Sequence, residues 1–201
     1  MRQIRLARTH DKAQISTLRV AEFSRSKDFR LLKPDLLHWC EMDEIHPVLG
    51  IWDGDAGVVG TLRLIRVDTP DRASEVLEAE LDEALRFPGL VFACAATRRS
   101  HQCRGLNQLL RYHAILAARE HGIQTLMSPI YQSAPRIAFM EDLGYVCRVM
   151  EKTWQTKLAP NSPRVLAFLE RSKFDKALGT LEQRINDLIE SYPWAGPPLT
   201  F

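Results

Sequence analysis

The chain has 201 residues, of which 45% are hydrophobic and 26% are charged, the composition of one globular domain with a sizeable core. A net charge of +2 does not predict nucleic-acid binding, because that needs a clustered basic face. No apolar run approaches the roughly 18 residues of a membrane helix, and the first residues lack the apolar stretch of a signal peptide, so we expect a cytoplasmic protein. The four cysteines form no C-x-x-C pair, which predicts reduced thiols and no metal site.

Hydrophobic periodicity predicts alternating strands and helices in the first half. In chain order these are an edge strand at Ile4–Leu6, a helix from Thr9 to Phe23, a short helix from Pro34 to Trp39, strands at 48–52 and 58–66 joined by the turn 53–57, and a helix over Ala73–Arg86. The run Leu90–Ala96 has no polar alternation, which predicts a central strand covered on both faces.

The second half continues the alternation, so the fold class is α/β. We expect a long helix from Gly105 to about Gly122, a strand at Thr125–Met127, a helix over Ala134–Leu143, a strand over Tyr145–Trp154, and a helical stretch after Pro163 to about Ser191. The last helix carries one apolar stripe, which packs on the domain or forms a dimer seam or a lid.

The segment between the central strand and the long helix carries the most informative motif. It reads Gln102-Cys103-Arg104-Gly105-Leu106-Asn107, and the arginines around it are Arg98, Arg99, Arg104 and Arg111. A glycine lets the backbone approach a ligand closely, and the first amides of a helix suit phosphate oxygens. A plain strand-to-helix turn with solvated arginines is the alternative.

This arrangement resembles the acyl-donor motif of the GNAT superfamily: glutamine or arginine, two residues, glycine, one residue, then glycine or alanine. Gln102 and Gly105 are in register, whereas Asn107 departs from the pattern. Ala138–Tyr145 resembles the later helix-and-strand motif of the superfamily. The resemblance implies a GNAT fold, with a mixed, mainly antiparallel sheet flanked by helices, over residues 1–155, and a C-terminal helical extension over 156–201.

Residues 15–150 resemble a narrower group, the acyl-homoserine lactone synthases and the N-acyl amino acid synthases. The likeness rests on Asp43-Glu44, on Gly60–Leu64 and on the acidic helix before the central strand. The central strand departs from that group, which usually has a glutamate followed by serine and arginine where this chain has Phe92–Ala96. The resemblance implies a fatty acyl donor, carried as acyl-CoA or on the phosphopantetheine of an acyl carrier protein, and an amine acceptor such as an amino acid.

The resemblance also implies a set of site residues. The donor-binding residues would be Ala95, Thr97, Gln102, Cys103, Arg104, Gly105, Leu106 and Asn107. Candidates for the base are Glu41, Asp43 and His46, each of which is otherwise a solvated loop side chain. Met140 stands where many GNAT enzymes have a proton-donating tyrosine, so either Tyr131 or water replaces it, or the thiolate leaves without being protonated.

Three functions remain open. The first is N-acyl transfer from a long-chain donor, whose tail would lie among Val91, Phe92, Leu126 and Met127. The second is short-chain acetyl transfer from acetyl-CoA, and the third is a catalytically idle module that binds an acyl ligand. The expected partners are a small-molecule amine, a possible acyl carrier protein and a possible second copy of the chain. The sequence disfavours Cys94 as a nucleophile, because unpaired cysteines are usually buried and no histidine is placed beside it.

Overall fold

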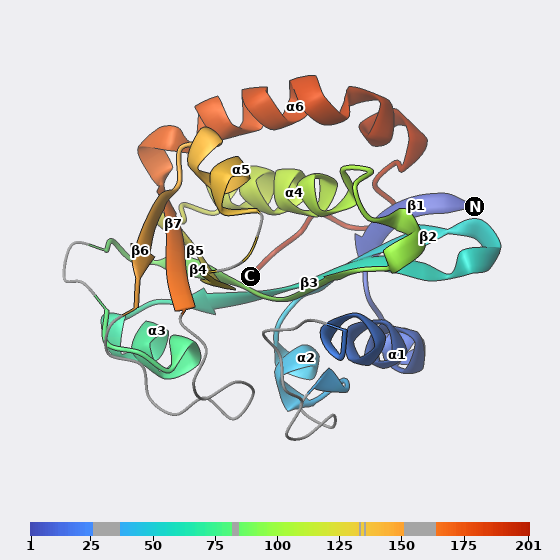
Figure 1. Cartoon of the computed structure of the whole chain (residues 1–201), viewed down its shortest axis with the longest axis horizontal. Coiled ribbons are helices and arrows are strands. Elements are labelled where there is room, and N and C mark those ends of the chain that lie inside the picture. The colour runs from blue at the N-terminus through green and yellow to red at the C-terminus, as the bar shows by residue number, and fades with distance from the viewer. Residues whose placement is uncertain (26–36, 82–84, 133, 135, 151–163) are drawn as a thin grey trace.

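A seven-stranded sheet forms the centre of the molecule (Figure 1). The computed structural model describes residues 1–25, 37–81, 85–132, 134, 136–150 and 164–201. The strands are β1 (Arg2–Leu6), β2 (Val48–Asp53), β3 (Val58–Val67), β4 (Gly89–Thr97), β5 (Thr125–Tyr131), β6 (Val146–Val149) and β7 (Arg164–Glu170). Their order is β1-β2-β3-β4-β5-β7-β6, and only β4 and β5 are parallel neighbours. The predicted α/β class with a mixed, mainly antiparallel sheet is confirmed.

Helices cover both faces of the sheet (Figure 1). On one face lie α1 (Lys12–Phe23), α2 (Glu41–Ile45) and α3 (Pro70–Leu77), and on the other lie α4 (Leu106–Glu120), α5 (Ile137–Asp142) and α6 (Phe174–Ser191). The largest apolar cluster packs α4 and α6 on the sheet, and two smaller clusters lie under α1 and α3. No helix in the described part of the chain is both long and apolar enough to cross a membrane.

The C-terminal helix forms where the sequence predicts it, and its stripe packs on the domain. Phe174, Leu178, Leu181 and Ile185 are all buried, and α6 lies along α4. In the structure, the apolar stripe thus faces α4 and the core.

The residues just before α6 differ from the prediction, because Arg164–Glu170 are a strand and not part of a helix. β7 pairs with β5 on one side and with β6 on the other. Its side chains from Val165 to Leu169 are buried on both faces of the sheet. A short apolar run of this kind shows no strand alternation, so periodicity alone does not separate it from a buried helix.

The predicted helix over Ala73–Arg86 is also wrong in its bounds. α3 begins at Pro70, where the Thr69 hydroxyl accepts a hydrogen bond from the Arg72 amide at 3.2 Å, and it ends at Leu77. Glu78 then adopts a left-handed conformation with φ of 51°, which stops the helix.

Two other predicted elements fall partly outside the described residues. The helix at Pro34–Trp39 begins among residues 26–36, which the structure does not describe. The helix that follows, α2, was not predicted. The strand expected over Tyr145–Trp154 is β6, and residues beyond 150 are outside the description.

Candidate functional site

The two parallel strands at the centre of the sheet separate partway along their length. β4 and β5 pair only from Gly89 to Val91, opposite Thr125 to Met127. Beyond these pairs, both strands continue without pairing to each other. The β4 edge that faces β5 therefore offers backbone groups to a ligand, since such groups need hydrogen-bond partners when buried.

A bulge on the other side of β4 bends the strand at the same place. Thr61 pairs with Ala96 and Arg63 with Ala93, so that one residue of β3 faces both Cys94 and Ala95. Cys94 has φ of 49°, a conformation that a non-glycine residue rarely adopts. Bulges of this kind re-aim a strand and recur next to active sites.

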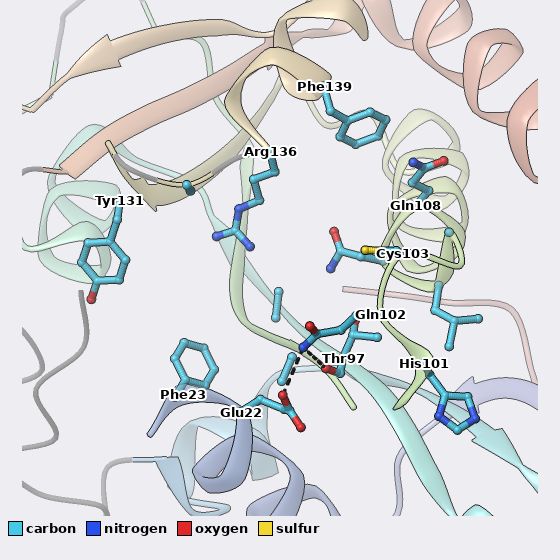
Figure 2. A pocket seen from close by; sticks show the side chains of 16 residues that line it. Glu22, Phe23, Thr97, His101, Gln102, Cys103, Gln108, Tyr131, Arg136 and Phe139 are labelled. Atoms are coloured by element: carbon cyan, nitrogen blue, oxygen red, sulfur yellow. Dashed lines mark hydrogen bonds between the residues drawn. The ribbon is translucent and has the colours of Figure 1, made fainter. Parts of the chain in front are cut away.

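A cavity of about 680 Å³ lies at this opening (Figure 2). All but one of the predicted donor-binding residues line it, namely Ala95, Thr97, Gln102, Cys103, Gly105, Leu106 and Asn107. The exception, Arg104, is exposed outside the lining. The structure thus brings together the residues that the motif predicts, although donor binding itself stays a prediction.

The loop before α4 is tied to the end of α1. The Gln102 side chain donates hydrogen bonds from Nε2 to the Thr97 carbonyl oxygen at 2.9 Å and to Oε2 of Glu22 at 3.1 Å (Figure 2). The Arg99 amide donates to Oε1 of Glu22 at 3.0 Å. The carboxylate of Glu22 therefore fixes the loop against the other face of the sheet.

Left-handed residues turn this loop into the start of α4. Cys103 has φ of 59° and Gly105 has φ of 80°, and Gly105 precedes the first turn of α4 without a capping side chain. The first amides of α4 therefore have no partner from a cap, and the helix dipole favours an anion there.

Asn107, which departs from the GNAT motif, has a structural partner. Its Oδ1 accepts a hydrogen bond from Nε of Arg111 at 3.0 Å, one turn further along α4. Arg111 is only 1% exposed, so the alternative of a plain turn with solvated arginines does not describe it. Arg98 is also held, because its Nη2 donates to the Val58 carbonyl oxygen at 2.9 Å. Of the four arginines, only Arg99 and Arg104 are exposed.

Asp43, a predicted base, lies in an ion cluster away from the cavity. Its two oxygens accept four hydrogen bonds of 2.7–2.9 Å from the guanidinium groups of Arg19 and Arg63. Burial raises the pKa of Asp43, but the hydrogen bonds and charges of both arginines outweigh it and lower the pKa to about 2. An acid this strong, with its lone pairs already occupied, has little capacity to take a proton at neutral pH.

The other two predicted bases also lie outside the cavity lining. Glu41 is exposed in the first turn of α2. His46 is half-buried, and burial together with the nearby Arg63 lowers its pKa, so the imidazole is neutral at pH 7. The structure offers Glu22 instead, the single carboxylate that lines the cavity within the described chain. The sequence does not point to Glu22, because it is one polar residue of an ordinary helix. Its position in the folded chain does.

The residues expected around an acyl tail are core residues. Val91, Phe92, Leu126 and Met127 are buried, and the cavity lining includes none of them. Met140 is likewise in the core, whereas Tyr131 lines the cavity. Arg136, which the sequence analysis did not single out, also lines it (Figure 2).

Within the described ranges, no three histidine, cysteine, aspartate or glutamate side chains are grouped to hold a metal ion. The four cysteines are all free thiols. Cys94 forms the bulge in β4 and is not part of the cavity lining.

Sequence comparison gave no match to a protein-family model and no match to a curated protein. Structural comparison gave many. The chain is similar to BjaI, a CoA-dependent acyl-homoserine lactone synthase, with TM-score 0.66 and 19% identity over 99% of this chain and 96% of that one. It is also similar to FeeM, an N-acyl amino acid synthase from uncultured soil microbes, with TM-score 0.62 and 11% identity over 91% of this chain and 98% of that one. An N-acetyltransferase from Staphylococcus aureus Mu50 matches with TM-score 0.60 and 13% identity over 85% of this chain and 99% of that one. The chain has the GNAT fold.

Proposed function

We propose that the chain is an N-acyltransferase. It takes an acyl group from the thioester of coenzyme A or of an acyl carrier protein and transfers it to the amine of an amino acid or a similar small molecule. One observation carries the proposal: a cavity opens where β4 and β5 separate, and the uncapped start of α4 lies beside it. The two features suit the two ends of a phosphopantetheine thioester.

The donor has a place for each of its parts. Its phosphates bind the amides at the start of α4, around Gly105 and Asn107, where the helix dipole favours negative charge. The pantetheine amides pair with the free edge of β4 near Ala95–Thr97, as an added strand would. Backbone N–H groups at the bulge then face the thioester carbonyl and stabilise the oxyanion that forms during attack.

The transfer needs no covalent enzyme intermediate. The acceptor nitrogen attacks the thioester carbon, the new C–N bond forms, the C–S bond breaks, and the thiolate leaves. Glu22 takes the proton that the attacking ammonium group loses, directly or through one water molecule, because it is the lining carboxylate. Tyr131, which also lines the cavity, returns a proton to the departing thiolate.

The synthases match a larger fraction of this chain than the acetyltransferases do. The synthases BjaI and MesI match over 99% and 98% of this chain, whereas the acetyltransferases match over 85%. This favours a synthase that acts on an amino acid derivative. A fatty acyl donor receives less support, since the apolar residues expected to hold its tail are packed in the core.

A transfer assay tests the proposal. The purified chain is mixed with CoA thioesters of two to sixteen carbons and with pooled amino acids, while thiol release and the mass of the N-acyl product are followed. We expect thiol release that depends on both substrates. The substitution Ala95→Phe should fill the cavity and abolish release, whereas Ala13→Phe, on the exposed side of α1, should leave it unchanged. Tight donor binding without transfer would favour the idle binding module, and absence of binding would refute the donor site.

A further inference from the structure

Two arginines near the opening between β4 and β5 have no acidic partner among the described residues: Arg136 lines the cavity, and Arg111 is buried behind the lining. Arg111 is 1% exposed, and its Nη2 donates to the Ser128 hydroxyl at 3.2 Å. Its guanidinium lies over the Phe92 ring, 5.3 Å from the centroid. Nη1 makes no hydrogen bond of normal geometry. Arg111 thus bridges β4 and β5 at the point where the two strands part, because Phe92 and Ser128 follow the last paired residues.

Arg136 is the second of these arginines, and it points into the cavity (Figure 2). Its Nε is buried without a hydrogen-bond partner. Burial lowers the pKa of Arg136 to about 10, and the positive charge of Arg111 nearby adds to the effect. The guanidinium remains charged at neutral pH because its pKa is still well above 7, although the nearby charge of Arg111 disfavours its protonated form.

Nothing in the described chain neutralises this pair. None of the ion pairs formed by described residues involves Arg111 or Arg136. The Tyr145 phenol lies close to Arg111, but burial raises its pKa, so it is neutral and supplies no counter-charge. A charge buried without a partner is destabilising, and the Arg19–Asp43–Arg63 cluster shows how the same fold neutralises arginines elsewhere.

The two arginines lie near the point that the acyl end of a donor bound along β4 would reach. In the proposed function the donor phosphates bind near Gly105, and a donor that runs along β4 from there leads toward the last β4–β5 pair. Arg111, bound to Ser128 and lying over Phe92, is buried beside that pair, and Arg136 lines the cavity in front of it. A donor in this orientation brings the far end of its acyl chain toward Arg136.

Building on the proposed function, we propose that the donor is the thioester of a short dicarboxylic acid, whose free carboxylate binds Arg136 with Arg111 behind it. A carboxylate would supply the missing negative charge and accept the unused guanidinium hydrogens. A neutral fatty tail would instead be buried against two charged groups, which disfavours it. A carboxylate could also belong to the acceptor, so the experiment must separate the two substrates.

Matched donors provide the test. We compare succinyl-CoA with butyryl-CoA, and glutaryl-CoA with pentanoyl-CoA, by calorimetric titration, because the members of each pair have equal chain length. The wild-type chain should bind the dicarboxylic member about tenfold or more tightly. Arg136→Gln should remove this preference without weakening the neutral donors, and Arg136→Lys should keep part of it. The control is Arg119→Gln, which removes an exposed arginine paired with Asp175 and should change neither affinity.

Three results would overturn the inference. Equal or tighter binding of the neutral donors by the wild-type chain would show that no acyl carboxylate is recognised. An Arg136→Gln variant that is folded and raises the KM of the acceptor, with the donor preference intact, would assign the arginines to the acceptor. Absence of binding by all four donors would refute the proposed function, and this inference with it, whereas the first two results leave acyl transfer standing.

Discussion

Glu22 and Asp43 are carboxylates on the same side of the sheet, but their surroundings give them different uses. Asp43 is fully enclosed between Arg19 and Arg63, whereas Glu22 lines the cavity, accepts hydrogen bonds from the loop before α4, and pairs with the single, exposed Arg25 at 3.0 Å. Asp43 therefore suits a structural role, and Glu22 is the carboxylate that a bound substrate can reach.

Glu22→Gln tests the role of the cavity carboxylate. The amide keeps a hydrogen-bond acceptor for the Arg99 amide but does not take up a proton, so kcat should fall by about 100-fold or more while donor affinity changes little. Steady-state rates and calorimetric donor titration separate the two quantities. Glu75→Gln, an exposed site on α3, is the control. A variant that loses donor affinity and kcat together would make Glu22 a clamp for the loop and not the base.

Asp43→Asn should act through stability. Removing one partner of a buried ion pair leaves uncompensated charge and costs about 3–5 kcal/mol. The folded-state pKa of about 2 lies below the unfolded-state pKa of about 3.9, so the ionised form stabilises the fold fully above about pH 5 and less as the pH falls toward 2. Urea denaturation should show a wild-type advantage over the variant that shrinks across that range.

The exposed Asp175, replaced in Asp175→Asn, supplies the matched control and should show little effect. A difference between wild type and Asp43→Asn that does not vary with pH would argue against ionised Asp43 as the source of the stability.

At the scale of elements, the features that the sequence predicted correctly are those whose signals lie within a few consecutive residues. The β2–β3 hairpin, the apolar strand β4 and the glycine at the start of α4 all carry their signatures in a few consecutive residues. β7 was missed because a strand between two others is apolar on both faces. The end of α3 was missed because Glu78 ends it in a conformation that glycine usually supplies.

Gly105 shows how one residue serves two elements. The donor-motif resemblance explains this glycine by close approach to a ligand, but a Cβ at this position would also lie 2.8 Å from Cδ1 of Leu188 in α6. A bulky residue at Gly105 would therefore disturb the packing of α6 as well as the loop before α4. A loss of donor binding in such a variant could then come from either change.

The double variant Gly105→Ala/Leu188→Ala separates the two effects. Gly105→Ala should destabilise the fold, both by left-handed strain of about 1–2 kcal/mol and by the contact with Leu188. Adding Leu188→Ala should cost less in the Gly105→Ala background than in the wild type, because it also removes the clash. Urea titrations of the four proteins give this coupling, and strictly additive losses would contradict the contact.

At the scale of the whole molecule, the candidate site depends on contacts that no local pattern encodes. The opening follows from the register of β4 against β3 on one side and from the early end of its pairing with β5 on the other. Glu22 arrives from α1 and Arg136 from the turn before α5, which lie on opposite faces of the sheet (Figure 1). The motif predicted the part of the lining that comes from the loop before α4, whereas no pattern in the sequence pointed to Glu22 or Arg136.

Photoaffinity labelling tests most directly whether the donor occupies this opening. A CoA thioester with a diazirine in its acyl group is irradiated with the wild-type chain, with and without excess unlabelled CoA, and the labelled peptides are identified by mass spectrometry. We expect labelling that CoA suppresses, at Ala95–Thr97 on β4 and at Tyr131 and Arg136 after the strands part. CoA-sensitive labelling confined to other segments, such as α2 or the outer face of α6, would contradict the donor site between β4 and β5.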